Sequence, residues 1–195
     1  MIVLASTSAA RGAMLTAAGV MFDPVAAHVD ETAVKDSLAG EPPLRIADAL
    51  AEAKAVKISM RYPDRLVLGA DQLLVTADGA LLDKPGTHAG AAAQLRQLMG
   101  AEHRLISATV IAEQGRAVWR ATGTARLTMR LLSDAFIKAY LDAEGDAVLA
   151  CVGSYRIEGR GAQLFTRIAG DHFTIQGLPL LAVLDYLRIR GELAS

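Results

Sequence analysis

The sequence predicts an α/β protein with a mixed β-sheet, and three observations lead to this fold class. Apolar runs of strand length alternate with longer stretches in which apolar residues recur every three or four positions, as on one face of a helix. Two turn signals, Asp78-Gly79 and Gln114-Gly115, join extended segments directly, whereas other extended segments are separated by helix-length stretches. The chain of 195 residues is 52% apolar and 21% charged, which suits one domain, residues 1–195, with a core that needs no disulfide.

The expected strands are short apolar runs that end at polar or glycine-containing turns. One of them ends directly at Asp71, and extended residues follow it. The full set is 2–5, 21–27, 66–70 with 73–75, 103–112, 117–130 and 163–168. Since hairpins and crossovers both occur, we expect a mixed sheet rather than a purely parallel one.

The expected helices combine helical spacing of apolar residues with capping signals at their ends. Pro42-Pro43 fits a helix start, and Thr87 and Ser133 are N-cap residues. The full set is 11–18, 42–62, 87–99, 134–143 and a last helix that begins at 177–179. The remaining polar segments, 28–32, 83–86 and 152–161, are expected to be loops.

Composition and missing motifs exclude several classes of function. A net charge of −1 disfavours binding to long nucleic acid. The sequence has no phosphate-loop motif, no complete dinucleotide fingerprint and no HExxH zinc motif. No apolar stretch is long enough to span a membrane and no secretory leader is recognised, so we expect a cytoplasmic protein. The single Cys151 is expected to be a small buried apolar residue rather than a nucleophile.

Three places in the sequence have residues suited to a phosphate site. Ser6, Ser8 and Arg11 lie where a buried strand turns into a helix, and free N–H groups, hydroxyls and a guanidinium there suit a phosphate. The alternative is plain N-capping. Lys54 lies at an inward position of its helix, and Lys84 is followed by the stiff residue Pro85. Both lysines suit an anion, although a snorkelling side chain is the simpler explanation.

Two acidic positions complete the candidate site. Asp30-Glu31 has carboxylates that suit a hard divalent cation, or are merely solvated. Asp71, directly after an apolar strand, is expected at the end of the sheet, where α/β proteins bind ligands. It suits a general base, or else it caps a turn. From the residues alone, the sequence describes an α/β phosphate-binding domain, with a metal-dependent enzyme as its most specific interpretation.

The order of these motifs resembles the Maf (septum formation protein) family of nucleoside triphosphate pyrophosphatases over about residues 2–187. The resemblance is carried by nine segments in one order: LASTSAARGAML, DET, Lys54-Ala55, GADQ, LDKPG, the H-x-L-x-S of His103 to Ser107, TARLTMRLLS, CVGSYRIEGRGAQLF and GLPL. It implies a curved mixed sheet flanked by helices, with two lobes and a cleft between them. It also implies hydrolysis of a nucleoside triphosphate to a monophosphate and pyrophosphate with a divalent metal, Mg²⁺ or Mn²⁺.

The resemblance also implies roles for individual residues. Asp71 matches the family's proton acceptor, and Glu31 and Asp71 match its acidic metal-associated positions. The positions that match phosphate-contacting residues are Ser6, Arg11, Lys54 and Lys84. The same resemblance implies a small nucleotide as the partner and leaves a homodimer open.

Departures from the majority pattern indicate the substrate. Gln72, Cys151-Val152-Gly153-Ser154 and Glu158-Gly159 resemble the 7-methyl-GTP pyrophosphatase branch of the family. A glutamate accepts from the N1–H and 2-amino groups of guanine but repels the carbonyl oxygens of uracil and thymine. Ala10 stands where most members carry arginine and that branch carries tryptophan. We therefore expect a house-cleaning enzyme for 7-methyl-GTP or another modified nucleotide. The alternatives are a dTTP/UTP pyrophosphatase and a nucleotide-binding division regulator without turnover.

Overall fold

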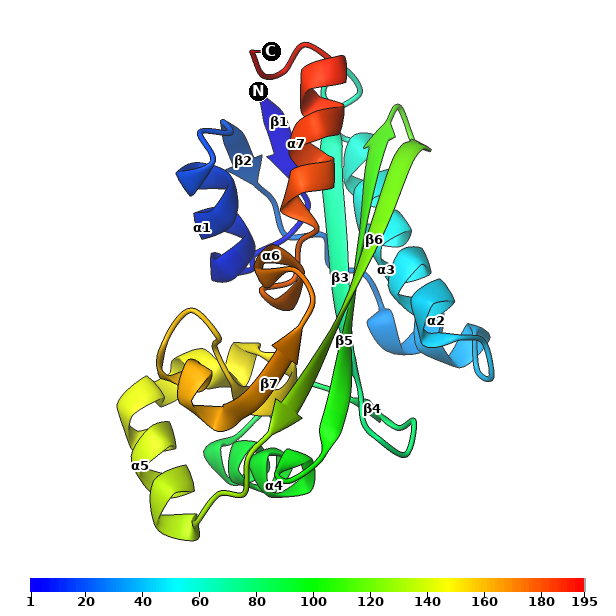
Figure 1. The fold of residues 1–195 in the computed structure, drawn as a ribbon. Helices are drawn as coiled ribbons and strands as arrows, with labels where there is room; N and C mark the ends of the chain where they lie inside the picture. Colours follow the sequence, from blue (N-terminus) through cyan, green and yellow to red (C-terminus); the bar gives the residue numbers. More distant parts are fainter. Residues whose placement is uncertain (195) are drawn as a thin grey trace. The chain divides into compact units, whose positions relative to one another are not determined.

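A computed structural model of the chain describes residues 1–194, so the last residue of the expected domain 1–195 lies outside the described part (Figure 1). The chain divides into two compact units, each built from segments that are distant in sequence. Unit 1 contains residues 1–72, 107–123 and the segment that begins at Gly177. Unit 2 contains residues 73–106 and 124–176. The single domain and the cleft between two lobes stay predictions.

Seven strands form one mixed sheet within the described residues, which confirms the predicted fold class. The order along the sheet is β2-β1-β3-β5-β6-β7, and β4 pairs with β3. β1 pairs in parallel with β2 and β3, whereas β3 with β4 and β6 with β7 are antiparallel. The strands are β1 (Ile2–Leu4), β2 (Phe22–Pro24), β3 (Val67–Val75), β4 (Leu81–Leu82), β5 (Glu102–Glu113), β6 (Arg116–Met129) and β7 (Phe165–Ala169).

Three helices begin at capping residues that the sequence signals. Ser8, Thr87 and Ser133 each accept a hydrogen bond from a backbone N–H of the following first turn. The α-helices are α1 (Ala9–Ala17), α2 (Glu31–Ser37), α3 (Pro43–Ser59), α4 (His88–Leu98), α5 (Asp134–Glu144), α6 (His172–Ile175) and α7 (Leu180–Ile189). Three short 3₁₀ helices, at Gly145–Ala150, Val152–Ser154 and Arg160–Leu164, occupy and border the segment expected to be irregular. Among the residues that the structure describes, no helix is both long and apolar enough to span a membrane.

Two expectations about secondary structure are wrong at the candidate site. Asp71 does not end a strand, because β3 continues through it to Val75. The loop expected at 28–32 gives way to α2 at Glu31, with Asp30 as its N-cap. The polar pair Asp71-Gln72 breaks the apolar pattern without breaking the strand, since tertiary contacts override the local pattern.

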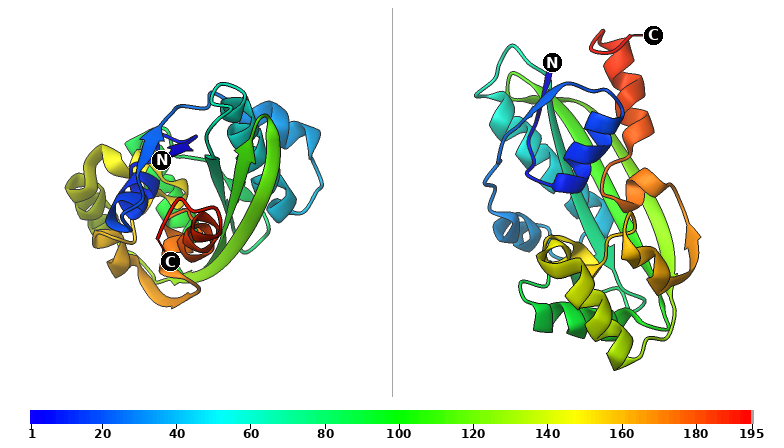
Figure 2. Two further views of the ribbon diagram at one scale, coloured as in Figure 1. Left: turned by 90° about the horizontal axis from the view of Figure 1, so that it is seen from above. Right: turned by 90° about the vertical axis from the view of Figure 1, so that its left-hand side faces the viewer.

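In unit 1, helices cover both faces of the sheet. α3 packs closely on β3, because a Cβ added to Gly69 would lie 2.6 Å from the backbone nitrogen of Ala55. On β6, Trp119 stacks on Tyr186 of α7 at 4.9 Å between ring centroids, while the next residue, Arg120, forms an ion pair with Asp48 of α3. Since successive strand residues point to opposite faces, α3 and α7 lie on opposite sides of the sheet (Figure 2).

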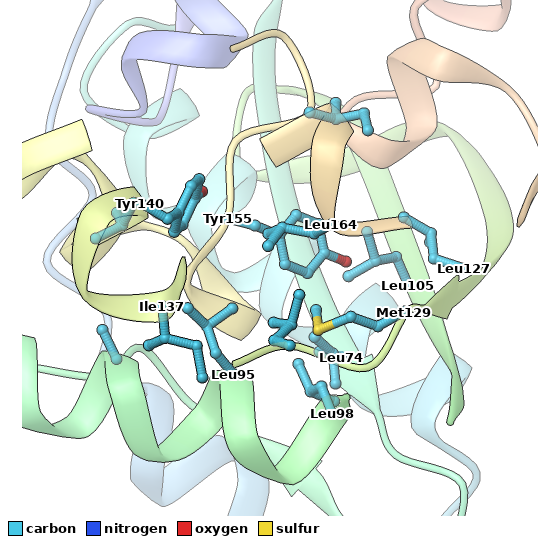
Figure 3. Packing of buried hydrophobic residues seen from close by; sticks show 14 of the residues in the cluster. Leu74, Leu95, Leu98, Leu105, Leu127, Met129, Ile137, Tyr140, Tyr155 and Leu164 are labelled. Atoms are coloured by element: carbon cyan, nitrogen blue, oxygen red, sulfur yellow. The ribbon is translucent and has the colours of Figure 1, made fainter. Parts of the chain in front are cut away.

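Unit 2 has a hydrophobic core of its own, in which residues of β3, β5 and β6 pack with α4, α5 and the 3₁₀ segment (Figure 3). His103 is 2% exposed, and its ring lies 5.6 Å from that of the core residue Tyr155, measured between ring centroids. Its Nε2 lies 2.8 Å from the hydroxyl of Tyr155, and its Nδ1 has no hydrogen-bond partner among the described residues. Burial lowers the pKa of His103 to about 4, so the imidazole is neutral in the folded protein at neutral pH.

We predict that Gly69→Ala destabilises the protein, because the new methyl group would press on the backbone of α3 at Ala51 and Ala55. Overpacking of this kind costs about 1–3 kcal/mol in the free energy of unfolding, measured by urea denaturation. Gly12→Ala is the control and should not destabilise the protein. Gly12 lies in helix α1, and its new Cβ would be an ordinary 3.6 Å from Phe22. Equal stability of the two variants would contradict the close packing of α3 on β3.

The buried neutral His103 predicts a loss of stability in acid. In the unfolded chain this group binds a proton near pH 6.5, but in the folded chain only near pH 4. The free energy of unfolding therefore falls as the pH drops from about 6.5 to about 4, by about 3 kcal/mol from this group. Denaturation curves across that range should show a shallower pH dependence for His103→Gln than for the wild type. An unchanged dependence would mean that other groups cause the loss.

Candidate functional site

The turn between β1 and α1 holds Arg11 in a fixed orientation. The Arg11 Nη1 donates to the Ser6 hydroxyl at 3.2 Å, and its Nε donates to the carbonyl of Gly177 at 2.8 Å. The Ser8 hydroxyl accepts from the backbone N–H of Arg11 at 3.4 Å and so caps α1. Ser8 is therefore an N-cap, as the simpler alternative proposed. Its hydroxyl proton, like free N–H groups in the first turn, is still suited to an anion.

A buried ammonium lies between two carboxylates in unit 1. The Lys54 Nζ is 2.6 Å from Oδ1 of Asp71 and 2.7 Å from Oε1 of Glu31. The side chains of Lys54 and Asp71 are 12% and 9% exposed, whereas that of Glu31 is 47% exposed. The predicted inward direction of Lys54 is thus confirmed, and its anionic partners are side chains of the chain itself.

Three elements converge to build this cluster of charges. Lys54 lies on the inward face of α3, next to the Ala55 that touches β3 at Gly69. Asp71 lies two residues further along β3, beyond Leu68, where β1 pairs with β3 for the last time. Glu31 is the first residue of α2, placed there by the Asp30 cap. Asp71 therefore lies beyond the carboxyl end of β1 rather than that of its own strand.

The electrostatics of the cluster favour a basic Asp71. Burial raises the pKa of Asp71 above its ordinary value, while the charge and hydrogen bond of Lys54 and the charge of Arg11 act in the opposite direction. Burial likewise lowers the pKa of Arg11, against the attraction of Asp71 and Glu31. Two cations and two carboxylates nearly balance. A buried carboxylate with a raised pKa is a better proton acceptor than an exposed one.

Gln72 and Ala10 each adjoin a residue of this cluster in sequence, Asp71 and Arg11 respectively. Gln72 follows Asp71 on the strand and so points to the opposite face, where its Nε2 donates to the hydroxyl of Ser107 at 3.0 Å. The Oε1 of Gln72 and the guanidinium of Arg11 both flank Gly177. Ala10 is the second residue of α1 and is half-buried, so it contributes a methyl group where relatives were expected to carry a larger side chain.

The remaining predicted residues belong to unit 2. Lys84 is exposed in the loop between β4 and α4. Its charge acts to lower the pKa of Cys151, which burial raises. The Oε1 of Glu158 accepts from Nε of Arg156 at 3.2 Å, and Arg156 also contacts Glu144 at 3.3 Å. The structure thus brings together Ser6, Ser8, Arg11, Glu31, Lys54 and Asp71 in unit 1, and holds Glu158 in a separate ion-pair network.

Sequence reasoning gave no role to two residues that orient this site. The Gly177 carbonyl fixes Arg11, and the backbone of Gly177 has a φ of 100°, which favours glycine. Ser107 fixes the amide of Gln72. Both contacts join segments far apart in sequence, and the only available signal was that each residue lies in a motif of the resemblance.

Glu31 and Asp71 are of the residue type that binds a hard divalent ion. No cluster of three or more His, Cys, Asp or Glu residues suited to a metal occurs within residues 1–194. Glu31 and Asp71 nevertheless converge on one point, which the Lys54 ammonium marks. Mg²⁺ is commonly held by one or two carboxylates, with waters and substrate phosphates completing its shell. Two carboxylates therefore suffice.

Comparison with known proteins defines the family. The family model for Maf-like protein matches residues 1–190. Similar proteins, each named nucleoside triphosphate pyrophosphatase, occur in Paramagnetospirillum magneticum and Sphingopyxis alaskensis, both 52% identical over 192 residues. These alignments cover 97% of this chain and 98% and 97% of the two relatives. A third relative, from Caulobacter vibrioides, is 48% identical over 194 residues and has the same name; the match covers 98% of this chain and 96% of the relative. The chain belongs to the Maf family.

Proposed function

We propose that the protein hydrolyses a nucleoside triphosphate to a nucleoside monophosphate and pyrophosphate. Membership of the Maf family and the names of its relatives support this activity. The main observation behind this proposal is the contact of buried Asp71 with Lys54. The carboxylates of the same cluster also attract Arg11 electrostatically. A basic carboxylate beside two cations suits the activation of water for attack on a phosphoryl group.

In the proposed reaction, the Asp71 carboxylate accepts a proton from a water molecule as the water oxygen attacks phosphorus. The bridging bond between the α and β phosphates breaks, so that one water molecule and one triphosphate give a monophosphate and pyrophosphate. Oδ1 of Asp71 accepts a hydrogen bond from Lys54 in the structure, and the same oxygen would contact the metal when one is bound. We therefore assign the proton to Oδ2. Proton transfer of this kind requires the water within hydrogen-bond reach of the base.

The cations and hydroxyls bind and orient the phosphates. Arg11 is fixed by Ser6 and Gly177, so its guanidinium is preorganised for a phosphate. Lys54 supplies a second cation, and we propose Ser6, Ser8 and Lys84 as further phosphate contacts. Glu31 and Asp71 would hold Mg²⁺ or Mn²⁺, which when bound neutralises phosphate charge that develops during the reaction.

We propose 7-methyl-GTP or another modified guanine nucleotide as the substrate. The Glu158 carboxylate would accept from N1–H and the 2-amino group, with Arg156 holding one of its oxygens. Gln72 would add an amide contact to the base, and the small Ala10 leaves room for a larger base. Removing such nucleotides would make this a house-cleaning enzyme, which we place in the cytoplasm and which acts as a monomer or a homodimer.

Asp71→Asn is expected to lower the rate of pyrophosphate release by about 10²–10⁴-fold, because the amide cannot accept the proton. Release is measured with Mg²⁺ or Mn²⁺ and a nucleoside triphosphate. The matched control is Asp64→Asn, a change of the same chemistry at an exposed aspartate, which should leave the rate unchanged. Near-normal turnover by the folded Asp71→Asn protein would remove Asp71 from the role of the base.

A panel of nucleotides tests the proposed base. The wild type should have its highest kcat/KM with 7-methyl-GTP, and Glu158→Gln should lower that value by roughly 10- to 100-fold through loss of a charged hydrogen bond. Glu102→Gln, at an exposed glutamate of the same unit, is the control. A clear preference of the wild type for dTTP and UTP would instead assign the chain to the other branch. Binding without turnover of every nucleotide would favour the regulator.

A further inference from the structure

Lys54 occupies the place where the two proposed metal-binding carboxylates converge. Its Nζ contacts Asp71 at 2.6 Å and Glu31 at 2.7 Å, and its side chain is 12% exposed. A buried ammonium needs anionic partners, because removing it from water without them is costly. The contacts therefore stabilise the protein without a ligand, and they use the carboxylate oxygens that a metal would use.

A divalent ion bound between Glu31 and Asp71 at this point would compete with the ammonium for Oδ1 and Oε1. Mg²⁺ binds carboxylate oxygens at about 2.0–2.1 Å. An ion bound to both carboxylates at the point of convergence would therefore take the position of Nζ, and the two positive charges would repel each other. Lysine is suited to such an exchange, because its charge is compact and its four-carbon stem is flexible. Once displaced, the ammonium needs another anion.

Arg11 differs from Lys54 in this respect. Its guanidinium is held by the hydroxyl of Ser6 and the carbonyl of Gly177, neither of which is a proposed metal ligand. Arg11 nevertheless contributes positive charge to the same cluster, since its charge acts on the pKa of Asp71. Lys54 thus occupies carboxylate oxygens by direct contact, whereas Arg11 acts on Asp71 through longer-range electrostatic attraction.

We propose that Lys54 competes with the divalent ion for the two carboxylates. The ammonium occupies their oxygens until a bound triphosphate draws it away. This inference rests on the proposed function, since that function assigns Glu31 and Asp71 to the metal. The exchange couples the two ligands: phosphate oxygens accept the ammonium, and the vacated carboxylates accept the metal. Coupling between two sites is reciprocal, so metal also strengthens nucleotide binding.

The test is calorimetric titration of Mn²⁺ into the protein without nucleotide. Lys54→Met keeps the length of the side chain and removes the ammonium, so it should bind Mn²⁺ about 5- to 150-fold more tightly than the wild type, the usual range of such coupling. Lys54→Arg, which keeps a cation in the cluster, should bind as weakly as the wild type. Arg11→Met removes a charge of the same sign without vacating a carboxylate oxygen, and should give a clearly smaller gain.

Two outcomes would overturn the inference. Equal gains for Lys54→Met and Arg11→Met would show general electrostatic repulsion rather than competition by contact. No gain for Lys54→Met, in a protein whose circular dichroism matches the wild type, would show no competition at all. Adding Glu31→Gln to Lys54→Met should abolish the gain, which places the ion at this cluster. Since the readout needs no turnover, failure here is distinct from a wild type that releases no pyrophosphate.

Discussion

The buried ion pair between Lys54 and Asp71 is the constraint on which the candidate site depends. Two charges with side chains 12% and 9% exposed are tolerated only when they are paired, since an unpaired buried charge is strongly destabilising. The pair therefore holds the inward face of α3 against the middle of β3. Lys54 also forms an ion pair with Glu31 at the start of α2. The same requirement leaves the cluster nearly neutral, although each of its charges suits a different part of a metal–triphosphate.

Small residues allow this pairing. The Cα of Gly69 lies so close to Ala51 and Ala55 that no side chain fits between β3 and α3. Lys54 precedes Ala55 on the helix and Asp71 follows Gly69 by two positions on the strand, so the close approach of the backbones brings the ammonium to the carboxylate. On the other face of the sheet, Gln72 reaches Ser107, and the chain passes through Gly177 into α7. Arg11 connects the two faces, because it is held at Gly177 and its charge acts on Asp71.

Much of this arrangement was predictable from residue patterns, but its contacts were not. Helical periodicity placed Lys54 inward, and the strand, turn and helix order around Arg11 was correct. Asp71 was expected at a strand end because a polar pair interrupts an apolar run, yet β3 continues past it under the influence of neighbouring strands. The short α2 was missed because helices of this length depend on capping and packing more than on propensity. Local patterns did not predict the partners of Arg11 and Gln72, because Gly177 and Ser107 lie far away in sequence. They did not predict the contact of Glu158 with Arg156 either, because a charged residue two positions away is not by itself a sign of an ion pair.

In the proposed function, this cluster directs water to the bond between the α and β phosphates. Identification of the products by ³¹P NMR tests it most directly. A guanosine triphosphate or its 7-methyl derivative, incubated with the protein and Mg²⁺, should give resonances of a nucleoside monophosphate and pyrophosphate in equal amounts. A nucleoside diphosphate with orthophosphate, or unchanged triphosphate with both of these nucleotides, would contradict the proposed reaction.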